Sequence, residues 1–314
     1  MNFFVLVRSG ATAVGSWLAA VAVIFALIRL MPGDPVDVFT NHMNVQASDA
    51  LVADYRRRWG LDQGLFVQFL SWLGGFVTLD WGTSFATGGS VLEELAPRLK
   101  WSAAIGVGGM LGALAIGSVL GFHAALLPGS WADHLSRGMA IAGQALPAFA
   151  VGLIALWIFA AELRWILPFS GNAIERLILP IALVAFFSVG SVSRLVRAGF
   201  NEIATAAFMR TALAKGLSRP AALWRHGRRH VAIVLVAGVA PDLAWIVGGT
   251  AVAEIVFGIP GLSERVVAAV SARDYPILQA YIALVALWIV FGLYLCSVLR
   301  RVLDPRPSAL PVGA

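Results

Sequence analysis

Residues Trp101–Leu127 read WSAAIGVGGMLGALAIGSVLGFHAALL, a run without any Asp, Glu, Lys or Arg. About 20 apolar residues in a helix span the hydrocarbon core of a bilayer, so this run is long enough to cross one. A helix is expected because lipid offers no hydrogen-bond partner to unpaired backbone groups. A membrane β-barrel would instead show alternation with a period of two residues, which we do not find. The run therefore predicts a transmembrane helix.

Glycines in this run occur in pairs four residues apart, Gly108 with Gly112 and Gly117 with Gly121. Small residues at this spacing allow two helices to approach closely. We expect a packed helix face here, and an interface that moves is the alternative.

Five further apolar runs lie before and after this one in the sequence. With it, the six candidate spans are Ala11–Leu30, Trp101–Leu127, Met139–Ala161, Leu177–Val196, Val231–Phe257 and Ile277–Leu299. The 314 residues are 59% hydrophobic and 13% charged, with a mean hydropathy of +0.83. Soluble domains carry about 25% charged residues. The composition therefore excludes a soluble enzyme, and it is too apolar for intrinsic disorder.

The predicted fold is an all-α membrane protein with six transmembrane helices. A structured external segment separates spans one and two, and a cytoplasmic helix lies between spans four and five. We expect one transmembrane domain over residues 1–314, divided into a first span (1–31), an external segment (32–100), a five-span core (101–299) that includes the loop 194–230, and a cytoplasmic tail (300–314).

Orientation follows from the distribution of Lys and Arg, which give the chain a net charge of +6. The loop between spans four and five carries Arg194, Arg197, Arg210, Lys215, Arg219, Arg225, Arg228 and Arg229 against one acid, Glu202. Basic loops stay in the cytoplasm. Both termini are therefore predicted to be cytoplasmic, and the basic charge is assigned to membrane topology and not to nucleic-acid binding.

The external segment shows its own helical signals. Ser48 can cap a short helix through Trp59, and Phe66–Val77 has apolar residues at helical spacing. We expect the second helix to lie on the membrane surface or against the bundle.

The basic loop also has helical signals on both sides of Gly216–Ser218. Leu213 and Leu217 share one helical face, Gly216 can end a helix, and Ser218 can cap the next one. These features predict two short amphipathic helices at the cytoplasmic face. The alternative is a solvated basic loop that only fixes topology.

The motif Arg210–Ser218, RTALAKGLS, resembles the EAA motif of permease subunits of bacterial ABC importers, in the dipeptide, oligopeptide and nickel class. Further matches to this family are the stretches Leu30–Pro35, Gly60–Gln63, Leu79–Ser84, Glu254–Leu262, Arg273–Pro276 and Leu303–Arg306. The resemblance extends over nearly the whole chain. Arg210 stands where the general motif has Glu, while Gly227, His230, Val234 and Ser263 also depart from the family pattern.

The resemblance implies that the basic loop docks on a cytoplasmic ATPase. The residues assigned to this coupling are Thr211, Ala212, Leu213, Lys215, Gly216, Leu217 and Arg219. No phosphate-binding GxxxxGK[ST] run is present, so ATP would be bound by partner subunits and this chain would be neither an enzyme nor a cofactor protein. The implied partners are a second permease, two ATPase subunits, an external substrate-binding protein and membrane lipid.

Three residues inside predicted spans are candidates for the translocation path: Asp242, Glu254 and Pro147. Acids within a membrane are costly and are functional suspects, and a proline can bend a span. The cargo implied by the resemblance is short peptides or a nickel chelate. The alternative function is a proton-coupled secondary transporter that uses Asp242.

Catalysis and metal binding are weakly indicated. His226 and His230 stand four residues apart, but Gly227 occupies the position where a zinc protease motif needs Glu. His123 has no evident partner for an intramembrane hydrolase. The only cysteine, Cys296, excludes an intramolecular disulfide.

Overall fold

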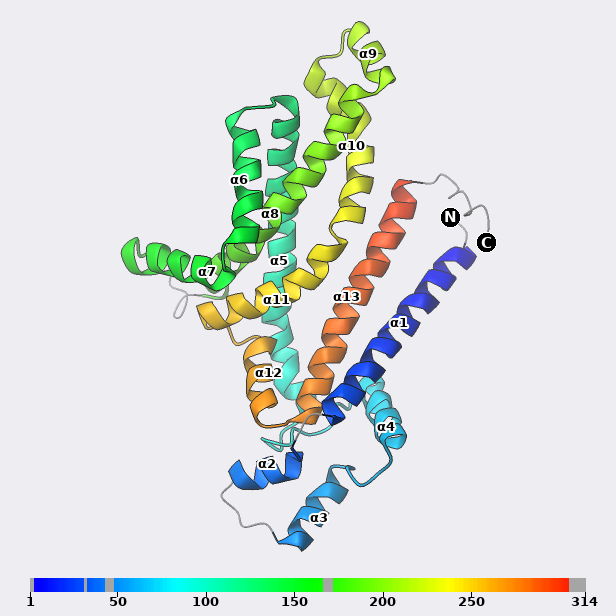
Figure 1. The fold of residues 1–314 in the computed structure, drawn as a ribbon, viewed down its shortest axis with the longest axis vertical. Helices are drawn as coiled ribbons and strands as arrows, with labels where there is room; N and C mark the ends of the chain where they lie inside the picture. The colour runs from blue at the N-terminus through cyan, green and yellow to red at the C-terminus, as the bar shows by residue number, and fades with distance from the viewer. Residues whose placement is uncertain (1–2, 31–32, 43–47, 166–171, 305–314) are drawn as a thin grey trace. The chain divides into compact units, whose positions relative to one another are not determined.

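The computed structural model describes residues 3–30, 33–42, 48–165 and 172–304. Within these ranges the regular structure is helical, apart from an isolated β-bridge between Thr83 and Ser90. In chain order the elements are α1 (Phe3–Arg29), α2 (Pro35–His42), α3 (Asp49–Arg58), α4 (Leu65–Thr78), α5 (Val91–Leu126), α6 (Trp131–Ala145), α7 (Ala148–Leu156), the π-helix η1 (Trp157–Glu162), α8 (Ala173–Thr205), α9 (Ala207–Ala214), α10 (Arg219–Gly238), α11 (Ala240–Phe257), α12 (Leu262–Ser271) and α13 (Tyr275–Leu303) (Figure 1). The prediction of an all-α chain is confirmed.

Five of the described helices are long and apolar enough to cross a membrane. They are Val7–Arg29, Val91–Leu126, Ala173–Thr205, Ala240–Phe257 and Tyr275–Leu303. The pair Trp131–Ala145 and Ala148–Glu162 provides a sixth span if it is counted as one crossing, but the two helices are bent by 109° at their break. The third predicted span is thus a broken element and not the continuous helix that the sequence suggested.

The break in this span lies at Pro147. The preceding Leu146 has extended backbone angles (φ −92°, ψ 135°), and Pro147 occupies the N-cap of α7. A proline within a helix clashes with the carbonyl four residues earlier and disfavours helical angles in the residue before it. The sequence-based expectation that Pro147 bends the third span is confirmed.

The fifth predicted span, Val231–Phe257, is also divided. Helix α10 ends with Val239 as its C-cap, and α11 starts at Ala240. Pro241 lies in the first turn of α11, where a missing amide proton leaves no helical hydrogen bond unmade. The same residue within a continuous helix would clash with the carbonyl of Ala237, so the chain starts a new helix instead.

The described residues form two compact units. Unit 1 combines Met1–Thr12, Ala104–Phe257 and Phe291–Ala314. Its centre is α8, which packs against α6, α10 and α11, and Figure 1 shows α6 alongside α8. Thirteen residues of α8 are buried, among them Val192 and Val196, which belong to the unit's hydrophobic core.

The glycine face of α5 packs on α8 within unit 1. A Cβ built on Gly117 would lie 2.7 Å from Val192 Cγ1, and one built on Gly121 would lie 2.5 Å from the carbonyl oxygen of Ser193. Only a residue without a side chain permits these contacts. The predicted helix-packing face is confirmed as a place of close helix approach.

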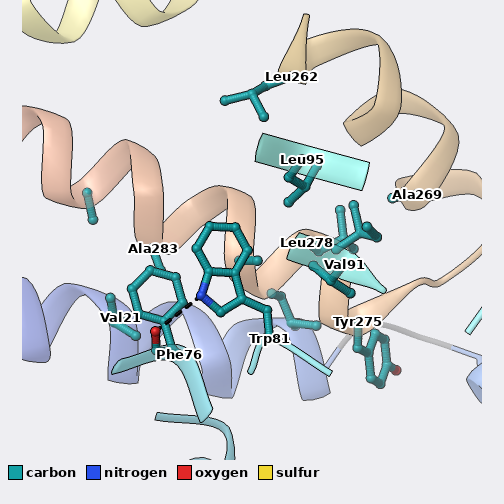
Figure 2. Packing of buried hydrophobic residues seen from close by; sticks show 14 of the residues in the cluster. Val21, Phe76, Trp81, Val91, Leu95, Leu262, Ala269, Tyr275, Leu278 and Ala283 are labelled. Atoms are coloured by element: carbon teal, nitrogen blue, oxygen red, sulfur yellow. Dashed lines mark hydrogen bonds between the residues drawn. The ribbon is translucent and has the colours of Figure 1, made fainter. Parts of the chain in front are cut away.

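Unit 2 combines Ala13–Ala103 with Gly258–Val290. Its core gathers buried side chains from α1, α4, α5, α12, α13 and the turn before α5. Figure 2 shows Trp81 at the centre of this core, where its indole Nε1 donates a hydrogen bond of 3.1 Å to the Phe76 carbonyl oxygen. The Trp81 and Phe76 rings also stack with a centroid separation of 5.2 Å. In the segment predicted to be external, α4 and the turn before α5 are therefore packed into unit 2, as the helical signals of the sequence suggested.

A buried ionic network joins distant parts of unit 2. The fully buried carboxylate of Asp274 accepts hydrogen bonds from Ser84 Oγ (2.5 Å), the Phe85 amide (3.0 Å) and Arg265 Nη2 (3.0 Å). Arg265 Nε also donates to Glu94 Oε2 at 2.6 Å. Burial lowers the pKa of Arg265, but the hydrogen bond and charge of Glu94, together with Asp274, outweigh burial and raise that pKa. Each charge in the network thus has a partner of opposite sign.

Candidate functional site

The predicted docking residues lie in what we call the coupling segment, Ala207–Arg225, which comprises α9 and the start of α10. Helix α9 ends where the sequence predicted. The amide of Gly216 donates to the Leu213 carbonyl (2.9 Å) and the amide of Leu217 to the Ala212 carbonyl (3.3 Å). These two bonds form a Schellman motif, which requires a left-handed residue after the C-cap. Gly216 supplies it with φ +86°.

The two faces of α9 have different roles. Met209 and Ala212 are buried in the core of unit 1, and Leu217 packs partly against the same core. Thr211, Leu213 and Lys215 are exposed. Ala212, one of the residues assigned to the ATPase contact, has its side chain covered by this chain's own core, and its part in coupling stays a prediction. Its small size serves internal packing of the coupling segment.

Helix α10 begins as the sequence suggested, but without the expected cap bond. Ser218 has the extended backbone of an N-cap (φ −64°, ψ 150°), yet its side chain makes no capping hydrogen bond among the described residues. Pro220 lies in the first turn and preorganises the backbone for a helix. With 20 residues, α10 is also longer than the short helix that was predicted.

Two aromatic residues of the coupling segment escaped the sequence analysis. Phe208 is 48% exposed and Trp224 is 54% exposed. Exposed aromatic side chains are enriched at protein interfaces. Their signal in the sequence was an aromatic residue on each side of the motif Arg210–Ser218.

Cations surround these aromatic residues. Arg210, Lys215, Arg219 and Arg225 are exposed, and none of them forms an ion pair within the described part of the chain. The surface of the coupling segment is thus basic and aromatic, a combination suited to an acidic partner surface.

Two departures from the family pattern have a structural reason in unit 1. A Cβ on Gly227 would lie 2.8 Å from the ring of Phe200, so glycine allows α10 to pack closely there. His230 contacts Glu202 of α8, with 3.0 Å between Nε2 and Oε2. Both residues therefore hold α10 against α8. Among the described residues, no group of three or more His, Cys, Asp or Glu is placed to hold a metal ion.

Asp242 lies in the first turn of α11 and is half-buried. Its carboxylate has a side-chain hydrogen bond with Ser191 and lies near the charge of Arg194. Its Oδ2 atom is buried and has no hydrogen-bond partner among the described residues. A carboxylate oxygen in this condition can accept a hydrogen bond from a cation or a hydroxyl group.

The two other path candidates differ in exposure. Glu254 is 1% exposed and belongs to the interior of unit 1, whereas Pro147 is exposed at the break between α6 and α7. The structure does not bring Asp242, Glu254 and Pro147 together around one described pocket. Their roles in translocation stay predictions.

Comparison with known proteins places these features in context. Residues 117–309 match the family described as "Binding-protein-dependent transport system inner membrane component". The chain is 31% identical over 288 residues to the glutathione transport system permease protein GsiC of Salmonella typhimurium (strain LT2), covering 92% of this chain and 93% of that protein. It is 30% identical over 282 residues to GsiC of Escherichia coli (strain K12), covering 90% and 91%.

The matches cover both the coupling segment and the apolar helices, and they agree with the resemblance found in the motif Arg210–Ser218. They give no support to a proton-coupled secondary transporter. The chain therefore belongs to the family of binding-protein-dependent transport system inner membrane components, the multi-pass permease subunits of ABC importers, which are not themselves enzymes.

Proposed function

We propose that this chain forms, with a second permease, the translocation path for short peptides of about the size of glutathione. The observation that carries this proposal is the 30–31% identity, over more than nine-tenths of their length, to permeases named for glutathione transport. A nickel chelate is the other cargo that the sequence suggested, and no described feature favours it over a peptide.

Partners follow from the family. A permease subunit of an ABC importer works with ATPase subunits, a binding protein and a second permease. For this chain we propose two ATPase subunits in the cytoplasm, an external substrate-binding protein, and both chain termini on the cytoplasmic side. The basic charge of the loop 194–230 supports this orientation.

The coupling segment is the proposed docking surface for the ATPase. Thr211, Leu213, Lys215 and Arg219 provide an exposed face, and Phe208 and Trp224 add aromatic area to it. Ala212 and Leu217, on the opposite side of the segment, pack against the core of unit 1 and hold the exposed face in place. When ATP binding moves the ATPase subunits, a rigid attachment of this kind transmits the movement to α8 and α10, and so to the spans.

Asp242 is the proposed cargo contact within the path. Its unpartnered Oδ2 can accept a hydrogen bond from the α-ammonium group that every unmodified peptide carries. This assignment requires neither a metal nor a cofactor in this chain.

The test is transport by the complete importer in proteoliposomes, with its own binding protein outside and ATP inside. We expect ATP-dependent uptake of labelled glutathione, and competition by unlabelled di- and tripeptides. Competition by a nickel–histidine chelate alone, with no effect of peptides, would contradict the peptide assignment. Uptake driven by a proton gradient without ATP would contradict the importer mechanism.

A further inference from the structure

A pocket of about 300 Å³ lies within unit 2, and neither the coupling segment nor Asp242 contributes to its lining. Aromatic side chains form much of its wall. Trp59 and Phe85, both in the wall, stack with a centroid separation of 4.0 Å and an angle of 8° between their planes. Such a stack gives the pocket a rigid apolar side.

The polar part of the wall has unmet hydrogen-bonding capacity. Four lining side chains carry buried polar atoms that have no hydrogen-bond partner among the described residues: Arg29 Nε and Nη1, Gln68 Oε1, Trp72 Nε1 and Gln279 Nε2. Buried polar groups in folded proteins are nearly always paired, so four such side chains around one pocket need an explanation. Four of the five atoms are donors, which indicates an acceptor-rich ligand.

Arg29 is the charged group among them. Its guanidinium carbon lies 4.9 Å from the centroid of the Phe25 ring and 4.6 Å from that of Tyr275. Contacts with ring faces orient a guanidinium without using its N–H groups as hydrogen bonds. The guanidinium is charged at all physiological pH values, so its free N–H groups attract an anion.

The other charges in the wall do not offset Arg29 directly. Arg58 is paired with Asp54 at 2.7 Å on its own helix. Asp80 is the acid of the wall, and its Oδ1 accepts a hydrogen bond of 3.4 Å from the Gly82 amide. Of the two arginines in the wall, Arg29 is therefore the one without an ion pair in the described part of the chain.

We propose that this pocket is a binding site for a small oxyanion, either the carboxylate of a short peptide or the phosphate of a lipid headgroup. Arg29 is the main anchor, while the Trp72 indole and the Gln279 amide donate further hydrogen bonds. The Gln279 side chain ends on a single-bond rotor, so its amide can turn toward an acceptor that enters the pocket. Water offers acceptor oxygens too, but it has no charge to balance the guanidinium.

The site goes beyond the permease function and does not depend on it, because binding is measured here without transport. The experiment uses the full-length chain with its partner permease in lipid nanodiscs. One arm titrates triglycine and, as a neutral match, triglycine amide. The other arm measures retention of phosphatidylglycerol by native mass spectrometry, with diacylglycerol as the phosphate-free match.

Arg29→Gln is expected to weaken binding at least about tenfold in one arm, because a charge-assisted contact is lost. Trp72→Phe replaces the indole by a smaller aromatic ring without the unpartnered N–H, and it should weaken binding about fivefold. The matched control is Arg57→Gln, which removes an exposed arginine of α3 that does not line the pocket. It should leave binding within about twofold of the original.

The two arms separate the sources of the oxyanion. Loss of triglycine binding in the variants, with no binding of the amide, identifies a free carboxylate. Loss of phosphatidylglycerol alone identifies a lipid headgroup. If Arg29→Gln does not fold, Trp72→Phe decides in its place. If neither arm depends on Arg29 or Trp72, the pocket holds only water and the proposal is wrong.

Discussion

Gly216 has a backbone role that a side chain disturbs without any collision. Its φ of +86° closes the Schellman motif of α9, and a Cβ built there meets no atom within 4 Å. Gly216→Val should therefore strain the backbone by about 1–2 kcal/mol and displace the exposed face of the coupling segment. We expect normal membrane abundance, weaker co-purification of the ATPase subunits and a sharp loss of uptake.

Gly216→Asn is the matched variant, because asparagine tolerates left-handed angles better than other residues with a side chain. It should keep most of the uptake that the valine variant loses. Equal losses in both variants would show that bulk at the surface matters and that the backbone angle does not.

The proposed contact between the Asp242 carboxylate and the cargo allows a second test at a single residue. Asp242→Asn keeps the size of the group and removes its charge, so binding of an ammonium group should weaken and uptake should fall about tenfold or more. ATPase co-purification should persist because the coupling segment is unchanged. Asp62→Asn, at an exposed residue of the external segment, is the control and should transport normally. Normal uptake by Asp242→Asn would remove this residue from the path.

Single residues were predictable from sequence where one local rule decides them. Gly216 after a helical run required a helix end, and the structure has one. The burial of Ala212 was not predictable, because a small residue suits both close docking and a buried core, and only the packing of α9 shows that this side chain is covered. Sequence spacing places a residue on a face, but it does not say what covers that face.

The contact between α5 and α8 depends on glycines that leave no room for a methyl group. Gly121→Ala would place a Cβ 2.5 Å from the Ser193 carbonyl oxygen, and this oxygen belongs to the backbone, which cannot turn aside. We expect a loss of about 1–3 kcal/mol and a lower thermal stability in detergent. Gly138→Ala, in α6, is the control: its Cβ meets no atom within 4 Å.

Because alanine favours helix over glycine by up to about 1 kcal/mol, Gly138→Ala should keep or slightly raise the stability. If Gly121→Ala is equally stable, the helices can separate without cost and the close contact is not essential to the fold.

Helix breaks were the least predictable elements. Pro147 and Pro241 coincide with breaks, yet Pro97 and Pro180 lie inside the continuous helices α5 and α8. A proline removes one hydrogen bond and crowds one carbonyl, and packing decides whether the helix bends slightly or ends. The apolar composition that identifies a span is the same on both sides of a break, so composition predicted a continuous helix.

The network around Asp274 stabilises unit 2 as a whole, because it joins the turn before α5 to α12 and α13. Asp274→Asn removes the charge that faces Arg265. It also replaces one of the two carboxylate oxygens that accept hydrogen bonds from the Ser84 hydroxyl and the Phe85 amide. We expect a loss of about 2–3 kcal/mol for charged hydrogen bonds of this kind and faster proteolysis within residues 79–90.

Glu264→Gln is the control for this prediction. Glu264 pairs with Arg98 at 2.9 Å but is 63% exposed, and exposed pairs contribute little. Proteolysis of this variant should resemble that of the unchanged chain. If Asp274→Asn is also unchanged, the network does not hold the turn.

Membrane topology is the prediction that concerns the whole chain. In a Cys296→Ser background, a cysteine at Asp62 should react with an impermeant reagent from outside, and one at Ser218 only after the membrane is opened. Both positions are exposed in the structure, so a lack of reaction reflects the membrane and not burial. Reaction of the Ser218 position from outside would overturn the proposed orientation.

The fold class and family were accessible from sequence because apolar runs and ordered motifs are local signals. The pocket in unit 2 was not, since Arg29, Trp72 and Gln279 come from three separate helices. In the sequence, Arg29 is only an arginine near the end of the first predicted span. Its contact with Tyr275 emerges only when α1 and α13 are packed together.

The hydrogen bond between Ser84 and Asp274 also has a consequence for the timing of synthesis. The two residues are 190 positions apart, and a ribosome adds about 5–20 residues per second. The turn that contains Ser84 therefore waits about 10–40 s before its buried partner has been made. During that interval the first segment of unit 2, Ala13–Ala103, is complete in sequence but lacks the contacts that Gly258–Val290 provides. A nascent chain that stalls before Asp274 would therefore leave the Ser84 hydroxyl and the Phe85 amide without their buried acceptor.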